Sequence, residues 1–159
     1  MSEPDADTED LTPAEELEDL LEVVVEALGL EADVRVEGSP EELVGTVEGA
    51  DVGLLIGRHG QTIEAVQHLA QRIVLRGGSG PRVVVDAGGY RAEREATLQA
   101  QANDAADSAL GSGEPVALPP MSAAERRFVH EHLRERGDVE THSEGQEPER
   151  RLIVTAPEG

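Results

Sequence analysis

The chain is 159 residues long and strongly acidic, with 34 Asp and Glu against 13 basic side chains and a formal net charge of −21. All 13 are Arg, and Cys is absent, which excludes lysine-dependent catalysis, cysteine-ligated zinc, thiol nucleophiles and disulfides. The length fits one ordinary domain or two small ones plus a tail.

The first half of the chain predicts a mixed unit of helices and strands. Residues 1–12 are polar and acidic and are expected to form a disordered tail. A helix is predicted from Pro13 to about Ala27, because Thr12 and Glu15 form a capping-box pattern and apolar residues recur at helical spacing through Leu28. The remaining predicted elements are a hairpin with strands at 34–36 and 43–47, a short helix at 53–56, a glycine loop, a helix at 61–75 and a strand at 82–86.

The helix predicted at 61–75 should bury one apolar face. The residues expected to point inward are Ile63, Val66, Leu69, Ala70, Ile73 and Val74.

The second half predicts a further small unit. A long helix, rich in Ala and Gln, is expected over 90–110, followed by an extended stretch at 115–120. Ser122 and Glu125 form a second capping-box pattern, which begins a helix that ends near Gly137 with Phe128, Val129 and Leu133 inward. Strands are expected at 139–142 and 151–155.

The charge is distributed unevenly along the chain. Residues 1–50 hold 17 acidic side chains against Arg35 alone, whereas residues 51–94 hold six Arg against four acids and have a local net charge of +2. An acidic chain is a poor candidate for nucleic-acid binding, because contacts to phosphates dominate the affinity. The one mildly basic stretch, however, surrounds the sequence Gly57-Arg58-His59-Gly60.

The spacing Gly-x-x-Gly is weak evidence by itself. It occurs twice, at 57–60 and 77–80, and a chain with 17 glycines produces such pairs by chance. The first pair lies between Ile56 and an amphipathic helix, where the backbone can approach a phosphate and Arg58 and His59 can donate to it. The alternative is a tight turn between two helices without a ligand, and at this point both interpretations stand.

Longer motifs resemble two known domains. The stretch Gly53-Leu-Leu-Ile-Gly-Arg-His-Gly-Gln-Thr-Ile63 is similar to the signature of a KH domain, and the element order α-β-β-α-α-β is that of the type II form. Downstream, Arg126 and His130 form the Arg-x-x-x-His pattern of the R-three-H domain. The tandem resembles the bacterial Jag family, also called SpoIIIJ-associated protein or KhpB, over about residues 13–156.

This resemblance implies an α+β fold, with a KH domain at 13–87 and a small α/β R-three-H domain at 88–159. It also implies a cytoplasmic protein that binds single-stranded RNA, or single-stranded DNA by the same chemistry, takes part in cell envelope growth and division, and pairs with a small KH-only protein. The implied RNA-binding residues of the KH half are Ile56, Gly57, Arg58, His59, Gly60 and Ile63. Those implied for the second half are Arg126, Arg127 and His130.

Two hypotheses remain open for the second half. The i, i+4 spacing of Arg126 and His130 places both on one helix face, where they can meet one phosphate. In the alternative, Arg126 bonds within its own domain and His130 is a partly buried structural histidine. The family usually has a basic helix at positions equivalent to 90–110 and an aromatic residue at 124, and this chain departs from both patterns. We therefore expect the KH loop to carry most of the affinity.

No pattern supports catalysis, a cofactor or a metal. His130 and His132 are two residues apart on a helix and point to different sides, and no histidine–glutamate zinc signature or serine elbow occurs. Neither a membrane span nor a signal peptide is expected, since no apolar run is long enough and the first ten residues hold five acids. A different class of function also fits: an adaptor that pairs with another KH protein, in which RNA binding is vestigial.

Overall fold

The structure is a computed structural model that describes residues 10–76 and 78–159. The chain divides into two compact units between Tyr90 and Arg91. Both units combine helices with a small sheet, which confirms the predicted α+β class. Most of the predicted tail, residues 1–9, lies outside the described residues, and the predicted domain bounds at 87 and 88 stay predictions.

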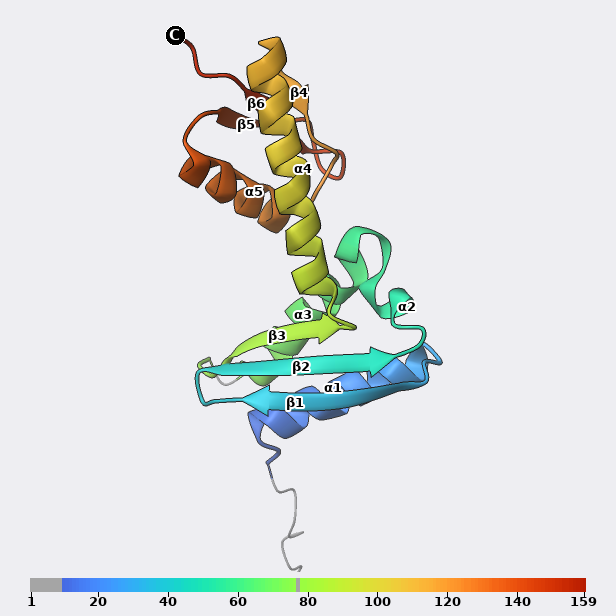
Figure 1. Ribbon diagram of the computed structural model, residues 1–159. Helices are drawn as coiled ribbons and strands as arrows, with labels where there is room; N and C mark the ends of the chain where they lie inside the picture. The colour runs from blue at the N-terminus through green and yellow to red at the C-terminus, as the bar shows by residue number, and fades with distance from the viewer. Residues whose placement is uncertain (1–9, 77) are drawn as a thin grey trace, which may run out of the picture. The chain divides into compact units, whose positions relative to one another are not determined.

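The first unit contains a three-stranded sheet with helices on one face (Figure 1). Its strand order is β1-β2-β3, in which β1 and β2 are antiparallel and β2 and β3 are parallel. The elements follow the predicted order α-β-β-α-α-β. They are α1 (Pro13–Ala27), β1 (Ala32–Gly38), β2 (Glu42–Gly49), α2 (Gly53–Ile56), the single-turn η1 (Arg58–Gly60), α3 (Gln61–Val74) and β3 (Arg82–Ala87).

Helix α1 begins as its sequence predicts. The backbone N–H of Glu15 donates to the Thr12 hydroxyl, and the Glu15 carboxylate accepts from both the Thr12 N–H and its hydroxyl. These bonds favour the charged carboxylate and hold the pKa of Glu15 below its ordinary value. On the face of α1 that is turned toward the sheet, Leu17 and Leu21 are fully buried against β2. A Cβ on Gly45 would lie 2.5 Å from Leu21 Cδ1, so the close approach of helix and strand requires glycine there.

Helix α3 covers the sheet beside α1, but its buried face is narrower than predicted. Ile63, Ala70 and Val74 are buried, as expected. Leu69 was predicted to point inward, and this was wrong, because its side chain is 49% exposed. Leu69 directly precedes Ala70, so it projects about 100° around the helix from the centre of the buried face. The sequence pattern alone gives too wide an apolar arc, because it does not define where the sheet ends.

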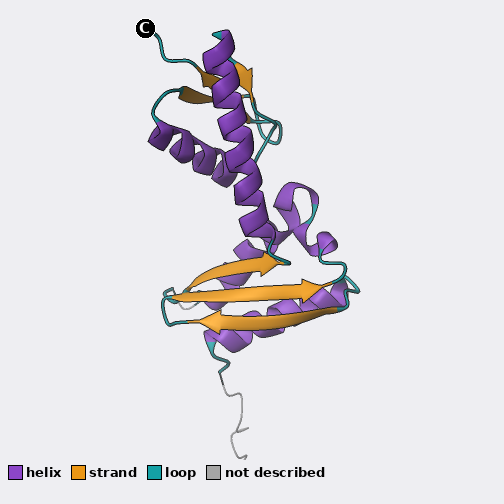
Figure 2. Cartoon of the chain, in the orientation of Figure 1, coloured by secondary structure: helices purple, strands orange, loops and turns teal. Residues whose placement is uncertain are grey.

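The second unit has a separate hydrophobic core. Its small sheet has the strand order β4-β6-β5 with antiparallel pairs, and Figure 2 shows it beside two helices. The core joins alanines of the long helix to Val129 and Leu133 of the shorter one and to Leu152 and Val154 of the sheet. The elements are α4 (Tyr90–Ser112), β4 (Val116–Ala117), α5 (Ala123–Arg136), β5 (Glu140–Glu144) and β6 (Arg151–Thr155).

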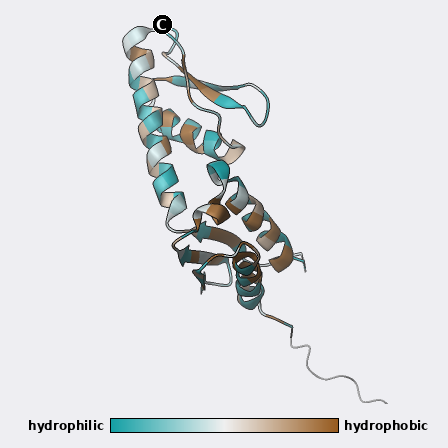
Figure 3. Cartoon of the chain, turned by 90° about the vertical axis from the view of Figure 1, so that its right-hand side faces the viewer, coloured by the Kyte–Doolittle hydropathy of each residue, from teal (hydrophilic) through white to brown (hydrophobic). Residues whose placement is uncertain are grey.

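Helix α4 extends two residues past the predicted end at Leu110. Gly111 and Ser112 remain helical, and the Ser112 hydroxyl donates to the Ser108 carbonyl at 2.8 Å. The helix ends at Gly113, whose φ of +72° is readily adopted by glycine and whose N–H donates to the Ala109 carbonyl. Much of α4 is drawn in pale and teal colours in Figure 3, because polar residues are frequent along it and four of its five buried residues are alanines.

Candidate nucleic-acid interface

The loop between α2 and α3 has an unusual backbone. Gly57, His59 and Gly60 all have positive φ angles, of +73°, +54° and +75°, and His59 is the one residue other than glycine with this property in the described part of the chain. Left-handed backbone favours glycine and is uncommon for other residues. The chain therefore leaves α2, turns sharply and begins α3 within a few residues.

Packing adds a second reason for the two glycines. A Cβ on Gly57 would lie 2.1 Å from the hydroxyl oxygen of Thr62, and a Cβ on Gly60 would lie 2.6 Å from the hydroxyl of Tyr90. Both distances are far below van der Waals contact. Gly60 is itself buried, so Tyr90 closes the loop from one side. The glycines are thus required by the fold of the loop, whether or not it binds a ligand.

The two residues between the glycines are open to solvent. Arg58 and His59 are exposed, and neither side chain makes a hydrogen bond or ion pair with any residue that the structure describes. Helix α3 starts directly behind them without a side-chain cap on its first turn. The positive end of a helix dipole and two unpaired donors together favour a bound anion.

The two isoleucines assigned to the loop differ in exposure. Ile56 is half-buried and has surface to offer a ligand. Ile63 is fully buried within the core. The resemblance placed Ile63 on the nucleotide groove, whereas here its side chain anchors α3 to the sheet and presents no surface. Leu54 in α2, 62% exposed, is an apolar residue that the sequence analysis did not select. Nothing in the apolar pattern distinguishes it from the buried Leu55.

In the second unit, the motif residues Arg126 and His130 have different environments. Arg126 is the one buried charged residue in the described part of the chain, with 8% exposure. Its Nη1 donates to the Met121 carbonyl at 2.8 Å, and its Nη2 donates to Glu147 Oε1 at 2.7 Å. This placement is the one that the alternative hypothesis expected for Arg126. His130 is instead exposed, with Nδ1 2.5 Å from the hydroxyl of Thr141.

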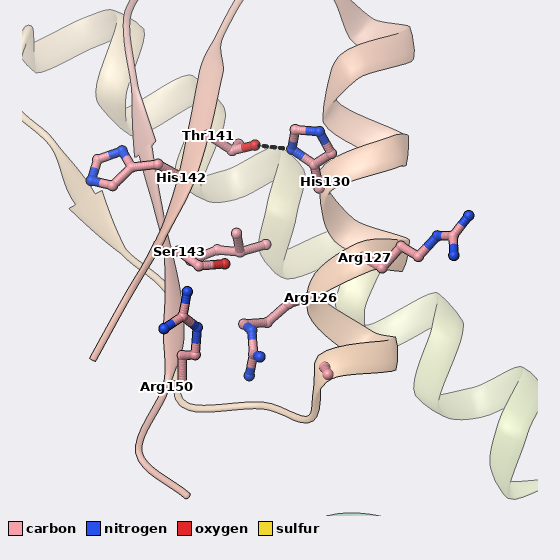
Figure 4. A pocket seen from close by; sticks show the side chains of 9 residues that line it. Arg126, Arg127, His130, Thr141, His142, Ser143 and Arg150 are labelled. Carbon is pink, nitrogen blue, oxygen red and sulfur yellow. Dashed lines mark hydrogen bonds between the residues drawn. The ribbon is translucent and has the colours of Figure 1, made fainter. Parts of the chain in front are cut away.

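A pocket of about 400 Å³ lies between α5 and the β5–β6 strands, and Figure 4 shows its side chains. None of the residues that line it is acidic, although acids outnumber Arg in the chain. The lining residues are Ala123, Arg126, Arg127, His130, Thr141, His142, Ser143, Arg150 and Leu152. Guanidinium, imidazole and hydroxyl groups are the donors that proteins use for phosphate oxygens.

Arg150, His142 and Ser143 were not among the predicted site residues. Ser143 reaches the pocket because β5 and β6 pair in a register that sets it opposite Leu152. His142, the preceding residue on β5, points to the other side of the strand in Figure 4, and its Nε2 lies 3.3 Å from Glu144 Oε1. The available signal was strand alternation, because Arg150 directly precedes β6 and is two residues before Leu152. Arg127, which was predicted, points away from the pocket centre in Figure 4 and pairs with Glu131 at 3.0 Å.

Across residues 10–76 and 78–159, no cluster of three or more His, Asp or Glu side chains is arranged to hold a metal ion. Within the same residues, no helix has the length and apolar character needed to cross a membrane.

The fold and the two candidate sites define a tandem of a KH domain and an R-three-H domain. Comparison with known proteins agrees: the KhpA/KhpB KH domain profile matches residues 14–86, and the R-three-H domain profile matches residues 96–156. The chain belongs to the KhpB family. Neither domain belongs to an enzyme family.

Curated relatives from several bacteria carry the name RNA-binding protein KhpB. The protein from Lactiplantibacillus plantarum is 39% identical over 137 residues, which cover 86% of this chain and 42% of the relative. That from Clostridium symbiosum is 34% identical, covering 86% and 63%, and that from Bacillus subtilis is 31% identical, covering 92% and 72%. The chain thus spans less than two thirds of the length of the first two relatives.

Proposed function

We propose that this protein binds single-stranded RNA, with the Gly57–Gly60 loop holding backbone phosphates. The observation that carries the proposal is the state of Arg58 and His59. In a chain of net charge −21, both side chains are exposed, and neither is paired with any carboxylate among the described residues. The relatives named RNA-binding protein KhpB support the same conclusion.

The binding mechanism follows from the geometry of the loop. The positive φ angles at Gly57, His59 and Gly60 turn the backbone sharply at the exposed Arg58 and His59, and the start of α3 adds the positive end of its helix dipole. These groups fix the sugar–phosphate chain but carry no sequence information. Ile56 and Leu54 have apolar surface exposed beside the loop, against which unpaired bases stack. The same chemistry accepts single-stranded DNA, since no group at the loop is specific for a 2′-hydroxyl.

In this proposal the second unit assists in RNA binding. Its pocket without acidic residues provides a separate phosphate site, in which His130 is exposed to a ligand. On the family resemblance, we assign the protein to the cytoplasm, as a post-transcriptional regulator of cell envelope growth and division with a small KH-only protein as partner.

The proposal is tested by reversing the charge of the loop. Fluorescence anisotropy with a pool of short single-stranded RNAs at low and high salt compares the wild type with the Arg58→Asp, His59→Asp variant. Each lost phosphate contact flattens the slope of log affinity against log salt by about 0.7 for a single strand. We expect the double variant to bind at least about tenfold more weakly and with a flatter slope.

The matched control changes the same residue types on α3. His68 and Arg72 are exposed and lie about 12 and 18 Å along the helix from the loop. His68→Asp with Arg72→Asp produces the same change in net charge, so an equal loss of affinity in both double variants would contradict a specific role for the loop. Absence of RNA binding by the wild type at low salt would overturn the proposal itself.

A second candidate function is an adaptor that pairs with another KH protein. The observation that favours it is the exposure of large apolar side chains in the first unit, among them Val23 at 62%, Leu54 at 62% and Leu69 at 49%. The adaptor hypothesis predicts unchanged partner binding in the Arg58→Asp, His59→Asp variant, measured by co-purification with a small KH-only protein. It also predicts that Leu69→Glu weakens that association.

A further inference from the structure

The pocket of the second unit contains three arginines, and their partners differ. In the family motif, Arg126 is the expected phosphate ligand. Its two terminal nitrogens are already engaged, one with the Met121 carbonyl and one with the Glu147 carboxylate. The charge of the guanidinium is therefore offset within the protein. These bonds tie the start of α5 to the turn that carries Glu147, which is a structural role.

Arg127 is also paired. Its Nε lies 3.0 Å from Glu131 Oε1 on the same helix, and its side chain is 80% exposed. In Figure 4 it points away from the side chains of β5 and β6. An exposed i, i+4 pair is weak, so Arg127 is free to move, but it is not held over the pocket.

Arg150 differs from both. No carboxylate among the described residues is within ion-pair distance of it. Its Nη1 donates to the Gly145 carbonyl at 3.0 Å, which holds the side chain in place without offsetting its charge. Figure 4 shows Arg150 beside Arg126, with Ser143 nearby. Two guanidinium groups thus lie in one pocket, and Glu147 offsets the charge of only one of them.

We propose that Arg150, which lies outside the Arg-x-x-x-His motif, is the phosphate-binding arginine of this pocket. Arg126 holds the pocket together, and Arg150 presents the positive charge that a phosphate group offsets. Ser143 and Thr141 line the same pocket and supply hydroxyl donors to the phosphate oxygens. This inference rests on the proposed RNA function for the source of the phosphate, a backbone phosphodiester. The phosphate chemistry itself does not depend on that source.

The test compares two neighbouring arginines in the full chain. Arg150→Gln and Arg151→Gln remove the same charge from adjacent positions, and Arg151 is exposed but does not line the pocket. Two probes are used: inorganic phosphate, followed by NMR shifts of the amides of Thr141 and Ser143, and a short single-stranded RNA, followed by anisotropy. We expect Arg150→Gln to weaken the binding of phosphate and of RNA by about fivefold to tenfold each. Arg151→Gln should weaken the binding of either probe by less than about twofold. Equal losses in the two variants, or no loss in either, would overturn the proposal.

A second pair of variants tests the structural role of Arg126, without substituting this buried residue. If Arg126 bound the phosphate, Glu147 would compete with the ligand, and Glu147→Gln would strengthen binding far more than Glu149→Gln. Glu149 lies in the same turn, and its carboxylate makes no hydrogen bond or ion pair with a described residue. We expect the two glutamine variants to bind phosphate and RNA within about twofold of each other. A selective gain in Glu147→Gln would assign the ligand to Arg126 and refute the assignment to Arg150.

The two probes separate this inference from the proposed function. Phosphate binding that depends on Arg150, combined with no RNA binding by the wild type, would support the pocket assignment and refute the RNA function. RNA binding that depends on Arg58 and His59 but is insensitive to Arg150→Gln, with phosphate shifts also unchanged, would refute only the pocket assignment.

Discussion

At the residue scale, the Gly57–Gly60 loop shows why its two glycines cannot be replaced by larger residues. Gly57 and Gly60 have backbone angles that favour glycine, and each faces a neighbour that leaves no room for a Cβ. The Gly-x-x-Gly spacing by itself indicated only a tight turn or a close approach of the backbone to a phosphate. The contacts with Thr62 and Tyr90 come from tertiary structure and explain why this pair, rather than any other glycines, forms the loop.

Replacing Gly60 with Ala should therefore destabilise the first unit. The alanine would have to adopt a left-handed backbone conformation, and its Cβ would lie 2.6 Å from the Tyr90 hydroxyl. We therefore expect the free energy of unfolding to fall by about 2–4 kcal/mol. Urea unfolding monitored by circular dichroism measures it. Gly53→Ala is the control, because a Cβ there meets open space within a helix. It should be neutral or stabilising by up to about 1 kcal/mol. Similar losses in both variants would show that the Tyr90 contact is unimportant.

At the scale of the element, helix α5 carries the motif residues of the second unit and is fixed at its start. The Ser122 hydroxyl accepts from the Glu125 N–H at 3.3 Å, and Glu125 accepts in return from the Ser122 N–H at 3.0 Å. The same glutamate accepts from Arg94 Nε of α4 at 2.6 Å, with both side chains largely buried. A capping pattern readable from sequence thus also joins two helices, a link that the sequence did not indicate.

We predict that Ser122→Ala costs about 1 kcal/mol in the free energy of unfolding of the second unit, because one N–H at the start of α5 loses its acceptor. Thermal unfolding followed by the NMR signals of α5 measures the effect. Ser108→Ala serves as control, since Ser108 is exposed within α4 and its hydroxyl makes no hydrogen bond with a described residue. That change should stay within about 0.5 kcal/mol. A cap variant as stable as the control would mean that packing alone fixes the helix start.

At the scale of the whole molecule, the chain builds two cores rather than one. The first joins α1 and α3 to the sheet of β1, β2 and β3, and the second joins α4 and α5 to the sheet of β4, β5 and β6. No buried residue belongs to both clusters. Small domains with their own cores can fold separately, although with modest stability.

Two fragments, residues 1–90 and residues 88–159, should each unfold cooperatively, with free energies of about 3–5 kcal/mol or less. The overlap lets the first keep Tyr90 and lets the second begin before α4. Urea titration of each fragment and of the full chain provides the measurement. A fragment that shows no sigmoidal transition would contradict independent folding and the predicted domain bounds near residue 88.

The sequence by itself determined the type and order of the elements, the capping residues of α1 and α5, and the place of the glycine loop. These depend on local backbone preferences and on apolar spacing within one segment. It did not determine which apolar residues are exposed, as Leu69 and Leu54 show, because burial depends on how far the covering sheet extends. Only the tertiary structure paired Arg126 with Glu147 and left Arg150 without a carboxylate partner among the described residues, since charge compensation depends on segments that folding brings together.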